Sequence, residues 1–190
     1  MDDKLSIERI FYPVKTLGPG KRVGIWTTGC LRGCQGCISP ELQYYDKEKE
    51  FEVETVIKMI RSITYPIDGF TISGGEPFLN PKALEALVRQ LAEINDDILI
   101  YTGYTLNELK QLSMKEVDNI LNTCAVLIDG PYIADLNNNC GLRGSSNQCV
   151  HIFRHHDRYE DYEMQERKIQ TVAYGKGMLM IGIPRRNSDD

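Results

Sequence analysis

The sequence predicts an α/β fold built around a parallel sheet. Two observations predict it: short apolar stretches alternate with segments whose apolar residues recur at helical spacing, and each apolar stretch is followed closely by a glycine. Strands that alternate with helices form βαβ units, whose right-handed crossovers place neighbouring strands parallel. The expected strands cover residues 22–28, 68–73, 97–102 and 124–128.

Helical patterns fill the gaps between these strands. Residues 52–63 carry an apolar stripe opposite charged residues. Asn80 followed by Pro81 is typical of a helix start, and the stripe after it continues to about residue 94. The stretch Thr105 to Glu108 matches a capping box that opens a short helix, and a second short helix is expected at about residues 114–121.

The two ends of the chain follow a different pattern. We interpret residues 1–20 as a lead-in segment that ends in a glycine–proline turn. Residues 169–174 and 178–183 flank a glycine-containing turn and predict a β-hairpin, followed by a polar tail. We therefore expect a core over residues 1–153 and a C-terminal extension over residues 154–190 that holds the hairpin and the tail.

Composition limits the classes of function. The chain has 190 residues, enough for one domain with a full core, and 42% hydrophobic residues. Its formal net charge of -5 gives no support to a phosphate-binding surface, so we do not expect a nucleic-acid partner. The N-terminus does not resemble a signal peptide, and no stretch approaches the length of a membrane span. We expect a cytoplasmic protein without a membrane partner, whose cysteines stay reduced.

Three cysteines follow the first expected strand directly. Cys30, Cys34 and Cys37 are the candidate metal ligands, because thiolates are soft donors that select iron–sulfur clusters, zinc or copper(I). Three thiolates are one short of a closed tetrahedral zinc site or a fully ligated four-iron cluster. In a cluster, one iron would stay open to another ligand.

Other interpretations of these cysteines remain open at this point. Zinc could take a fourth ligand from elsewhere in the chain, and Cys140 and Cys149 near His151 could contribute to such a composite site. The simpler interpretation is that neither of these two thiols is a metal ligand. A redox pair at Cys34 and Cys37 would leave Cys30 unexplained. An electron-transfer ferredoxin normally uses four cysteines for each cluster.

A second motif follows the second expected strand. Gly74 and Gly75 allow a ligand to approach the backbone, and the Glu76 carboxylate with nearby carbonyls can accept hydrogen bonds from an ammonium group. A plain strand-to-helix turn is the alternative. Because this motif comes one βα unit after the cysteines, both should lie on the same rim of a parallel sheet.

Together, these residues resemble the radical S-adenosylmethionine superfamily. Its CxxxCxxC motif is matched by Cys30, Cys34 and Cys37, and its GGE motif by Gly74 to Glu76. The resemblance implies a partial (β/α) barrel, a [4Fe-4S] cluster with one open iron, and S-adenosylmethionine bound to that iron. It further implies reductive cleavage to a 5′-deoxyadenosyl radical. The cofactors would carry this chemistry, and no protein side chain is expected to be catalytic.

Further blocks resemble one branch, the activating proteins of anaerobic ribonucleotide reductase. The blocks are residues 18–22, 101–104, 126–132 and 143–148. This resemblance implies an anaerobic enzyme that takes a hydrogen from a glycine of a glycyl-radical enzyme, most simply the large subunit of that reductase. It also implies an electron donor such as flavodoxin or ferredoxin. Thr102 and Asp129 are candidate cofactor contacts, and the block at 143–148 would contact the cofactor or partner, or form loop hydrogen bonds.

The chain departs from that branch after Cys37, where Ile38 and Ser39 replace an aromatic residue and asparagine. An alternative is therefore a radical enzyme that acts on a small molecule or another peptide. A different class would be a non-catalytic electron-transfer or zinc-structural module. Among single residues, we expect Cys124 and Trp26 to be buried and His155 to be solvated.

Overall fold

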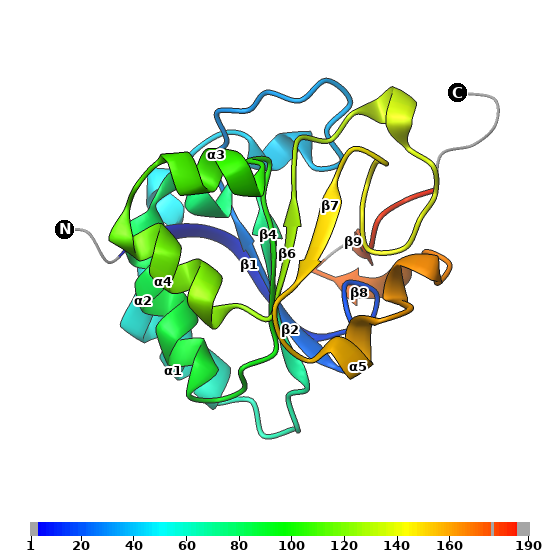
Figure 1. Cartoon of the computed structure of the whole chain (residues 1–190). Coiled ribbons are helices and arrows are strands. Elements are labelled where there is room, and N and C mark those ends of the chain that lie inside the picture. The colour runs from blue at the N-terminus through cyan, green and yellow to red at the C-terminus, as the bar shows by residue number, and fades with distance from the viewer. Residues whose placement is uncertain (1–3, 176, 186–190) are drawn as a thin grey trace.

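The computed structural model describes residues 4–175 and 177–185, so the expected polar tail at 186–190 lies outside the described residues. These described residues form one seven-stranded sheet in the order β3-β1-β2-β4-β5-β6-β7. Strands β8 and β9 form a separate two-stranded sheet, which lies beside the large sheet in Figure 1. In this described part of the chain, single-turn 3₁₀ helices cover Pro40–Leu42, Lys47–Lys49, Pro77–Leu79, Ala134–Leu136 and Tyr162–Met164.

The centre of the large sheet is parallel, as predicted. It consists of β2 (Arg22–Thr27), β4 (Gly69–Gly74), β5 (Ile98–Tyr101) and β6 (Val126–Asp129), each paired parallel to the next. These strands are almost wholly buried, since protein covers both faces of the sheet. Their carboxyl ends therefore meet at one edge, where the two sequence motifs lie.

The edges of the sheet are antiparallel, and here the structure differs from the expected lead-in segment. Residues 1–20 are not merely a lead-in, because β1 (Lys4–Val14) pairs antiparallel with β2. Register shifts after Ile7 and after Phe11 break the period-two pattern that would have marked this strand. Strand β3 (Glu50–Glu52) pairs with β1, and β7 (Cys149–Ile152) pairs with β6. With these antiparallel edges the sheet stays open, and the partial barrel is not confirmed.

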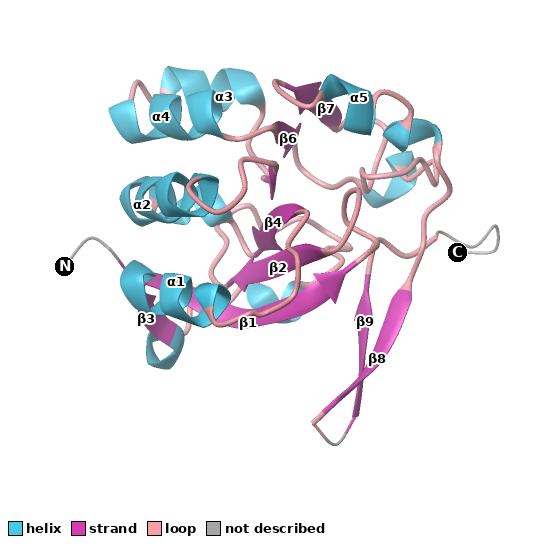
Figure 2. Cartoon of the chain, turned by 90° about the horizontal axis from the view of Figure 1, so that it is seen from below, coloured by secondary structure: helices cyan, strands magenta, loops and turns pink. Residues whose placement is uncertain are grey.

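One face of the sheet is covered by helices (Figure 2). They are α1 (Val53–Arg61), α2 (Pro81–Ala92), α3 (Leu106–Gln111) and α4 (Lys115–Thr123). The predicted capping box at α3 is confirmed, with the Glu108 N–H donating to Thr105 Oγ1 over 3.1 Å and the Thr105 N–H to Glu108 Oε2 over 2.6 Å. Within the described residues, no helix is long and apolar enough to cross a membrane.

The C-terminal segment packs on the opposite face. It contains α5 (His156–Tyr159) and the predicted hairpin, formed by β8 (Gln170–Tyr174) and β9 (Gly177–Ile181) (Figure 2). Ile181 and Ile183 join an apolar cluster with Trp26, which is buried as expected. The extension therefore shares its core with the sheet, while a division into two units at residue 153 stays a prediction.

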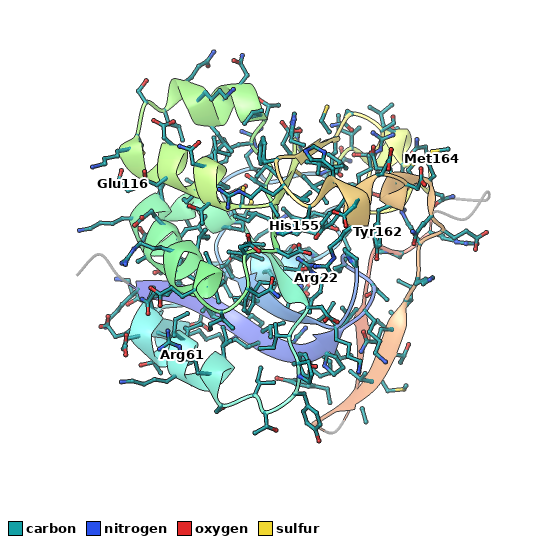
Figure 3. All side chains as sticks on the ribbon, turned by 60° about the horizontal axis from the view of Figure 1, so that its bottom comes forward. Arg22, Arg61, Glu116, His155, Tyr162 and Met164 are labelled. Carbon is teal, nitrogen blue, oxygen red and sulfur yellow. The ribbon has the colours of Figure 1, made fainter. Side chains whose placement is uncertain are left out.

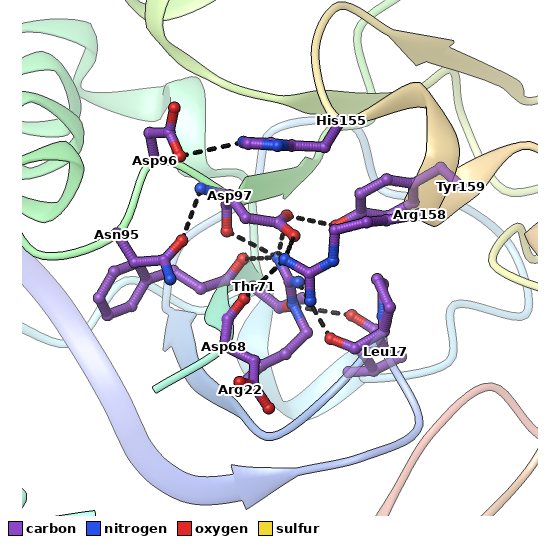
Figure 4. A network of polar contacts seen from close by, with 12 residues as sticks. Leu17, Arg22, Asp68, Thr71, Asn95, Asp96, Asp97, His155, Arg158 and Tyr159 are labelled. Carbon is purple, nitrogen blue, oxygen red and sulfur yellow. Dashed lines mark hydrogen bonds and ion pairs between the residues drawn. The ribbon is translucent and has the colours of Figure 1, made fainter. Parts of the chain in front are cut away.

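A buried polar network fastens α5 to the amino ends of the strands (Figures 3 and 4). Arg22 is 0% exposed, and its Nη2 lies 3.1 Å from Asp97 Oδ1. Asp97 also accepts a hydrogen bond from Tyr159 over 2.5 Å and forms an ion pair with Arg158. At the surface beside this network, His155 stays 30% exposed, and its Nε2 lies 3.0 Å from Oδ1 of the exposed Asp96.

Cys124 is fully buried, as predicted, and this gives a test of the fold. Burial raises the pKa of its thiol to about 12, so its thiolate fraction at pH 8 is on the order of 1 in 10,000. In the native, metal-free protein we expect iodoacetamide to modify exposed Cys149 and spare Cys124, as read by peptide mass spectrometry. Both should react in urea. Equal native labelling of the two thiols would contradict the packing described.

Candidate iron–sulfur centre and cofactor cavity

The three predicted cysteine ligands line one cavity of about 370 Å³ at the carboxyl edge of the parallel strands. The loop that carries them is closed at its base by two backbone hydrogen bonds. The Gly29 N–H donates to the Leu42 carbonyl, and the Cys30 N–H donates to the Gln43 carbonyl, both over 2.9 Å. These two hydrogen bonds therefore fix the position of the loop where it leaves β2.

The cysteine side chains are neither fully buried nor fully exposed. Gly33 and Gly36 have φ values of 58° and 73°, in the left-handed region that glycine tolerates best, and they turn the loop between the ligands. Burial raises the pKa of the Cys30 thiol, while the Arg32 N–H, 3.5 Å from its sulfur, acts in the opposite direction. Binding to a metal would deprotonate this thiol.

The spacing of the three loop sulfurs bears on the choice between a cluster and a single metal ion. In a tetrahedral zinc site with Zn–S bonds of about 2.3 Å, neighbouring sulfurs lie about 3.8 Å apart. Among the described residues, the only set of three ligand atoms within 4.8 Å of one another is a different one, formed by Asp129, Cys149 and His151. As placed here, the sulfurs of Cys30, Cys34 and Cys37 do not all lie within 4.8 Å of one another, so they are not gathered around one tetrahedral ion. In a cluster, each thiolate binds a different iron atom.

The GGE turn is hydrogen-bonded directly to the base of the cysteine loop. The Gly75 N–H donates to the Thr27 carbonyl over 2.8 Å, and the Glu76 N–H donates to the Gly29 carbonyl over 2.7 Å. Gly74 has a φ of 117°, and a Cβ on Gly75 would lie 2.3 Å from the Gly29 oxygen. The close backbone approach leaves no room for larger residues, so the two motifs form one unit beside the cavity.

Glu76 and Thr102 link the ends of β4 and β5 within the cavity wall. The Glu76 side chain is 2% exposed and accepts hydrogen bonds from Thr102 Oγ1 over 2.8 Å, from the Gly103 N–H over 2.7 Å and from the Phe78 N–H over 3.0 Å. Burial raises the pKa of this carboxyl, and the three donors act against that rise. Glu76 thus holds the turn in place with a carboxylate already occupied by protein donors.

Asp129 does not line the cavity, although it follows β6 on the expected edge. Its carboxylate accepts hydrogen bonds from the Leu106 N–H over 2.5 Å and the Cys149 N–H over 3.1 Å. Side chains alternate along a strand, and Leu127 already faces the helix-side core, so Asp129 faces that side too. The neighbouring Gly130 borders the cavity instead.

The block at residues 143–148 mainly forms loop hydrogen bonds. Gln148 accepts from the Gly144 N–H over 2.8 Å and donates to the Gly130 carbonyl over 2.9 Å, while both Gly144 and Gln148 border the cavity. Arg167, which the sequence reasoning missed, is 7% exposed and donates to the Arg143 and Gly144 carbonyls. Nothing in its local sequence marks this role.

A second missed residue is Arg9 on β1. It borders the cavity, and its guanidinium carbon lies 6.0 Å from the Trp26 ring centroid and 5.3 Å from that of Tyr174. Tyr174 belongs to the hairpin, and Leu179 to Pro184 supply further cavity wall. The extension is thus part of the site, which the motifs alone do not reveal.

The cysteine loop is also tied to α3. Arg32 Nη1 lies 3.2 Å from Glu108 Oε1, and the Arg32 guanidinium carbon lies 4.9 Å from the Tyr104 ring centroid. The backbone N–H of Thr105, and after it the Arg32 side chain, hold the pKa of Glu108 below its usual value. One carboxylate therefore caps a helix and anchors the loop.

Comparison with known proteins now defines the class. The family described as "4Fe-4S single cluster domain" matches residues 16–151. Anaerobic ribonucleoside-triphosphate reductase-activating proteins of Salmonella typhi and Enterobacteria phage T4 are 33% and 32% identical to the chain, over 76% of its length and 97% and 92% of theirs. A shorter match, 35% identical over 81 residues, covers 40% of the chain and 32% of the pyruvate formate-lyase-activating enzyme of Staphylococcus aureus.

These matches confirm the resemblance drawn from the motifs. The chain is a single-cluster iron–sulfur protein of the radical S-adenosylmethionine type and belongs to the family of anaerobic ribonucleoside-triphosphate reductase-activating proteins. The matched family region ends at residue 151, before the hairpin.

Proposed function

We propose that the protein cleaves S-adenosylmethionine reductively and generates a glycyl radical on an anaerobic ribonucleoside-triphosphate reductase. The observation that carries the proposal is that Cys30, Cys34 and Cys37 share one cavity with the GGE turn, in a chain of the activating-protein family. When bound, the cluster supplies the electron that splits the sulfonium and leaves a 5′-deoxyadenosyl radical.

The chain's own residues bind, orient and shield. Cys30, Cys34 and Cys37 would hold three irons and leave the fourth open for the amino and carboxylate groups of S-adenosylmethionine. Gly74 and Gly75 let that amino acid part approach the backbone, and Thr102 borders the same space. Glu76 fixes the turn through its three hydrogen bonds, so the cradle is preorganised.

The hairpin and Trp26 would keep water from a reactive radical. Ile181 is 2% exposed and packs with Trp26 on the cavity side of the sheet. The cysteine loop exposes Leu31 (82%) and Ile38 (41%), apolar side chains suited to contact with a partner protein. We propose that the reductase docks there and that a flavodoxin or ferredoxin supplies the electron.

The test is product formation after anaerobic reconstitution. The reduced protein, loaded with about four irons per chain, should convert S-adenosylmethionine to 5′-deoxyadenosine and methionine, measured by mass spectrometry. Intact S-adenosylmethionine under strong reduction, in protein with its full iron content, would contradict the proposal.

A glycine substitution tests the cradle separately from the cluster ligands. In Gly75→Ala the new Cβ would lie 2.3 Å from the Gly29 oxygen and 2.7 Å from the Leu42 oxygen, so the turn must move away from the cysteine loop. We expect a stability loss of about 1–3 kcal/mol and at least a tenfold loss of 5′-deoxyadenosine formation. The matched control is Gly177→Ala, whose Cβ meets only the Tyr174 oxygen at 4.0 Å and should change neither quantity.

A further inference from the structure

A second group of metal-ligating atoms lies outside the cavity. One oxygen of Asp129, the sulfur of Cys149 and one ring nitrogen of His151 all lie within 4.8 Å of one another. Asp129 on β6 is directly opposite Cys149 on the antiparallel β7, and His151 follows two residues later on the same face. The pairing of the two strands therefore holds the three side chains together.

The geometry of this group is close to that of a zinc site. With ligand bonds of about 2.0–2.3 Å, a tetrahedral zinc ion has neighbouring ligand atoms about 3.3–3.8 Å apart. His151 Nε2 lies 3.0 Å from Asp129 Oδ2, close to this spacing, and the Cys149 sulfur lies within 4.8 Å of both ligand atoms. The His151 ring stacks on Phe153, with centroids 6.2 Å apart and planes at 7°, which fixes its orientation.

The surroundings of the histidine nitrogen suit a metal ligand. His151 Nε2 is buried and makes no hydrogen bond within the described part of the chain, although a carboxylate lies beside it. A buried polar nitrogen without a hydrogen bond is costly, and coordination of a cation would satisfy it. The Asp129 carboxylate is positioned by the Leu106 and Cys149 N–H groups, as ligating carboxylates commonly are.

We propose that Asp129, Cys149 and His151 bind one zinc ion, separate from the iron–sulfur centre. A thiolate, an imidazole and a carboxylate form a donor set typical of zinc, and the two anionic ligands balance its charge. Cys149 is exposed, so the ion can enter from solvent and keep a water as its fourth ligand.

The site would stabilise one wall of the cofactor cavity. Gly130 follows Asp129 and Gln148 precedes Cys149, and both border the cavity. Cys140, considered from the sequence as a companion of Cys149, is not in this group, and its sulfur lies 3.8 Å from Arg143 Nη2.

Metal analysis of the reconstituted holoprotein tests the proposal independently of its activity. After incubation with zinc and desalting, we expect one zinc per chain beside an unchanged iron content. Cys149→Ser and His151→Ala should each weaken zinc binding at least about 100-fold, whereas Cys140→Ser should bind zinc like the wild type. Circular dichroism verifies that the variants are folded.

Cobalt gives a second readout that does not depend on the cluster. In full-length protein with Cys30, Cys34 and Cys37 changed to serine, added Co²⁺ should produce a thiolate-to-cobalt absorption band, and further Cys149→Ser should remove it. Holoprotein that binds no zinc, or zinc binding that Cys149→Ser leaves unchanged, would overturn the proposal.

Discussion

Replacing Cys34 with alanine abolishes the iron–sulfur centre and, with it, cleavage of S-adenosylmethionine. Cys34 is the central one of the three proposed cysteine ligands, and its side chain lines the cavity. A cluster held by three thiolates cannot lose one without losing an iron ligand. We expect the iron content after reconstitution to fall from about four per chain to a small fraction of that, and 5′-deoxyadenosine to become undetectable.

The control for this prediction is Cys140→Ser, which changes a half-buried thiol outside the cavity lining. That variant should retain both the iron and the cleavage activity. A Cys34→Ala protein that keeps the wild-type iron content and absorption spectrum would show that the cluster takes other ligands, and the assignment of the loop would be wrong.

Replacing Arg22 with methionine causes the largest expected loss of stability. Arg22 and Asp97 are 0% and 1% exposed in their side chains, so removing the guanidinium leaves the carboxylate with only the half-exposed Arg158 for charge balance. The Thr71 hydroxyl and the Phe70 carbonyl also lose their donor. Removal of one partner from a buried ion pair costs about 3–5 kcal/mol.

Urea unfolding of the metal-free protein, followed by circular dichroism, measures this loss. Arg61→Met is the matched control, because Arg61 pairs with Glu93 over 3.2 Å at the surface, with side chains 55% and 58% exposed. An exposed pair contributes under about 1 kcal/mol. Equal stability of the two variants would contradict the structural importance of the Arg22 network.

The parallel centre of the sheet could be predicted because its signals are local. Apolar strands, the Asn80 cap and the capping box at Thr105 each depend on a few neighbouring residues. Strand β1 escaped prediction because two register shifts disturb its alternation. The open sheet could not be predicted from local patterns, since closure depends on how distant edge strands pair.

Some residues of the candidate site could likewise be predicted from local motifs, and others could not. The cysteines and the GGE turn are short contiguous motifs, so their spacing in the sequence was enough to predict them as site residues. The structure places both motifs at one cavity. The direction of a side chain is harder to predict. Asp129 lies at the expected edge of the sheet, but its side chain faces the helices and not the cavity. Arg9 and Arg167 act through contacts with residues far along the chain, which no local pattern encodes.

Electron paramagnetic resonance tests the central claim most directly. The reduced, reconstituted protein is mixed with S-adenosylmethionine and an anaerobic ribonucleoside-triphosphate reductase, and the reductase is then examined for an organic radical. We predict the doublet of a glycyl radical, absent with Cys34→Ala and absent without S-adenosylmethionine. Cleavage of S-adenosylmethionine without a doublet on the reductase would contradict the proposed partner, and neither cleavage nor doublet would contradict the radical chemistry itself.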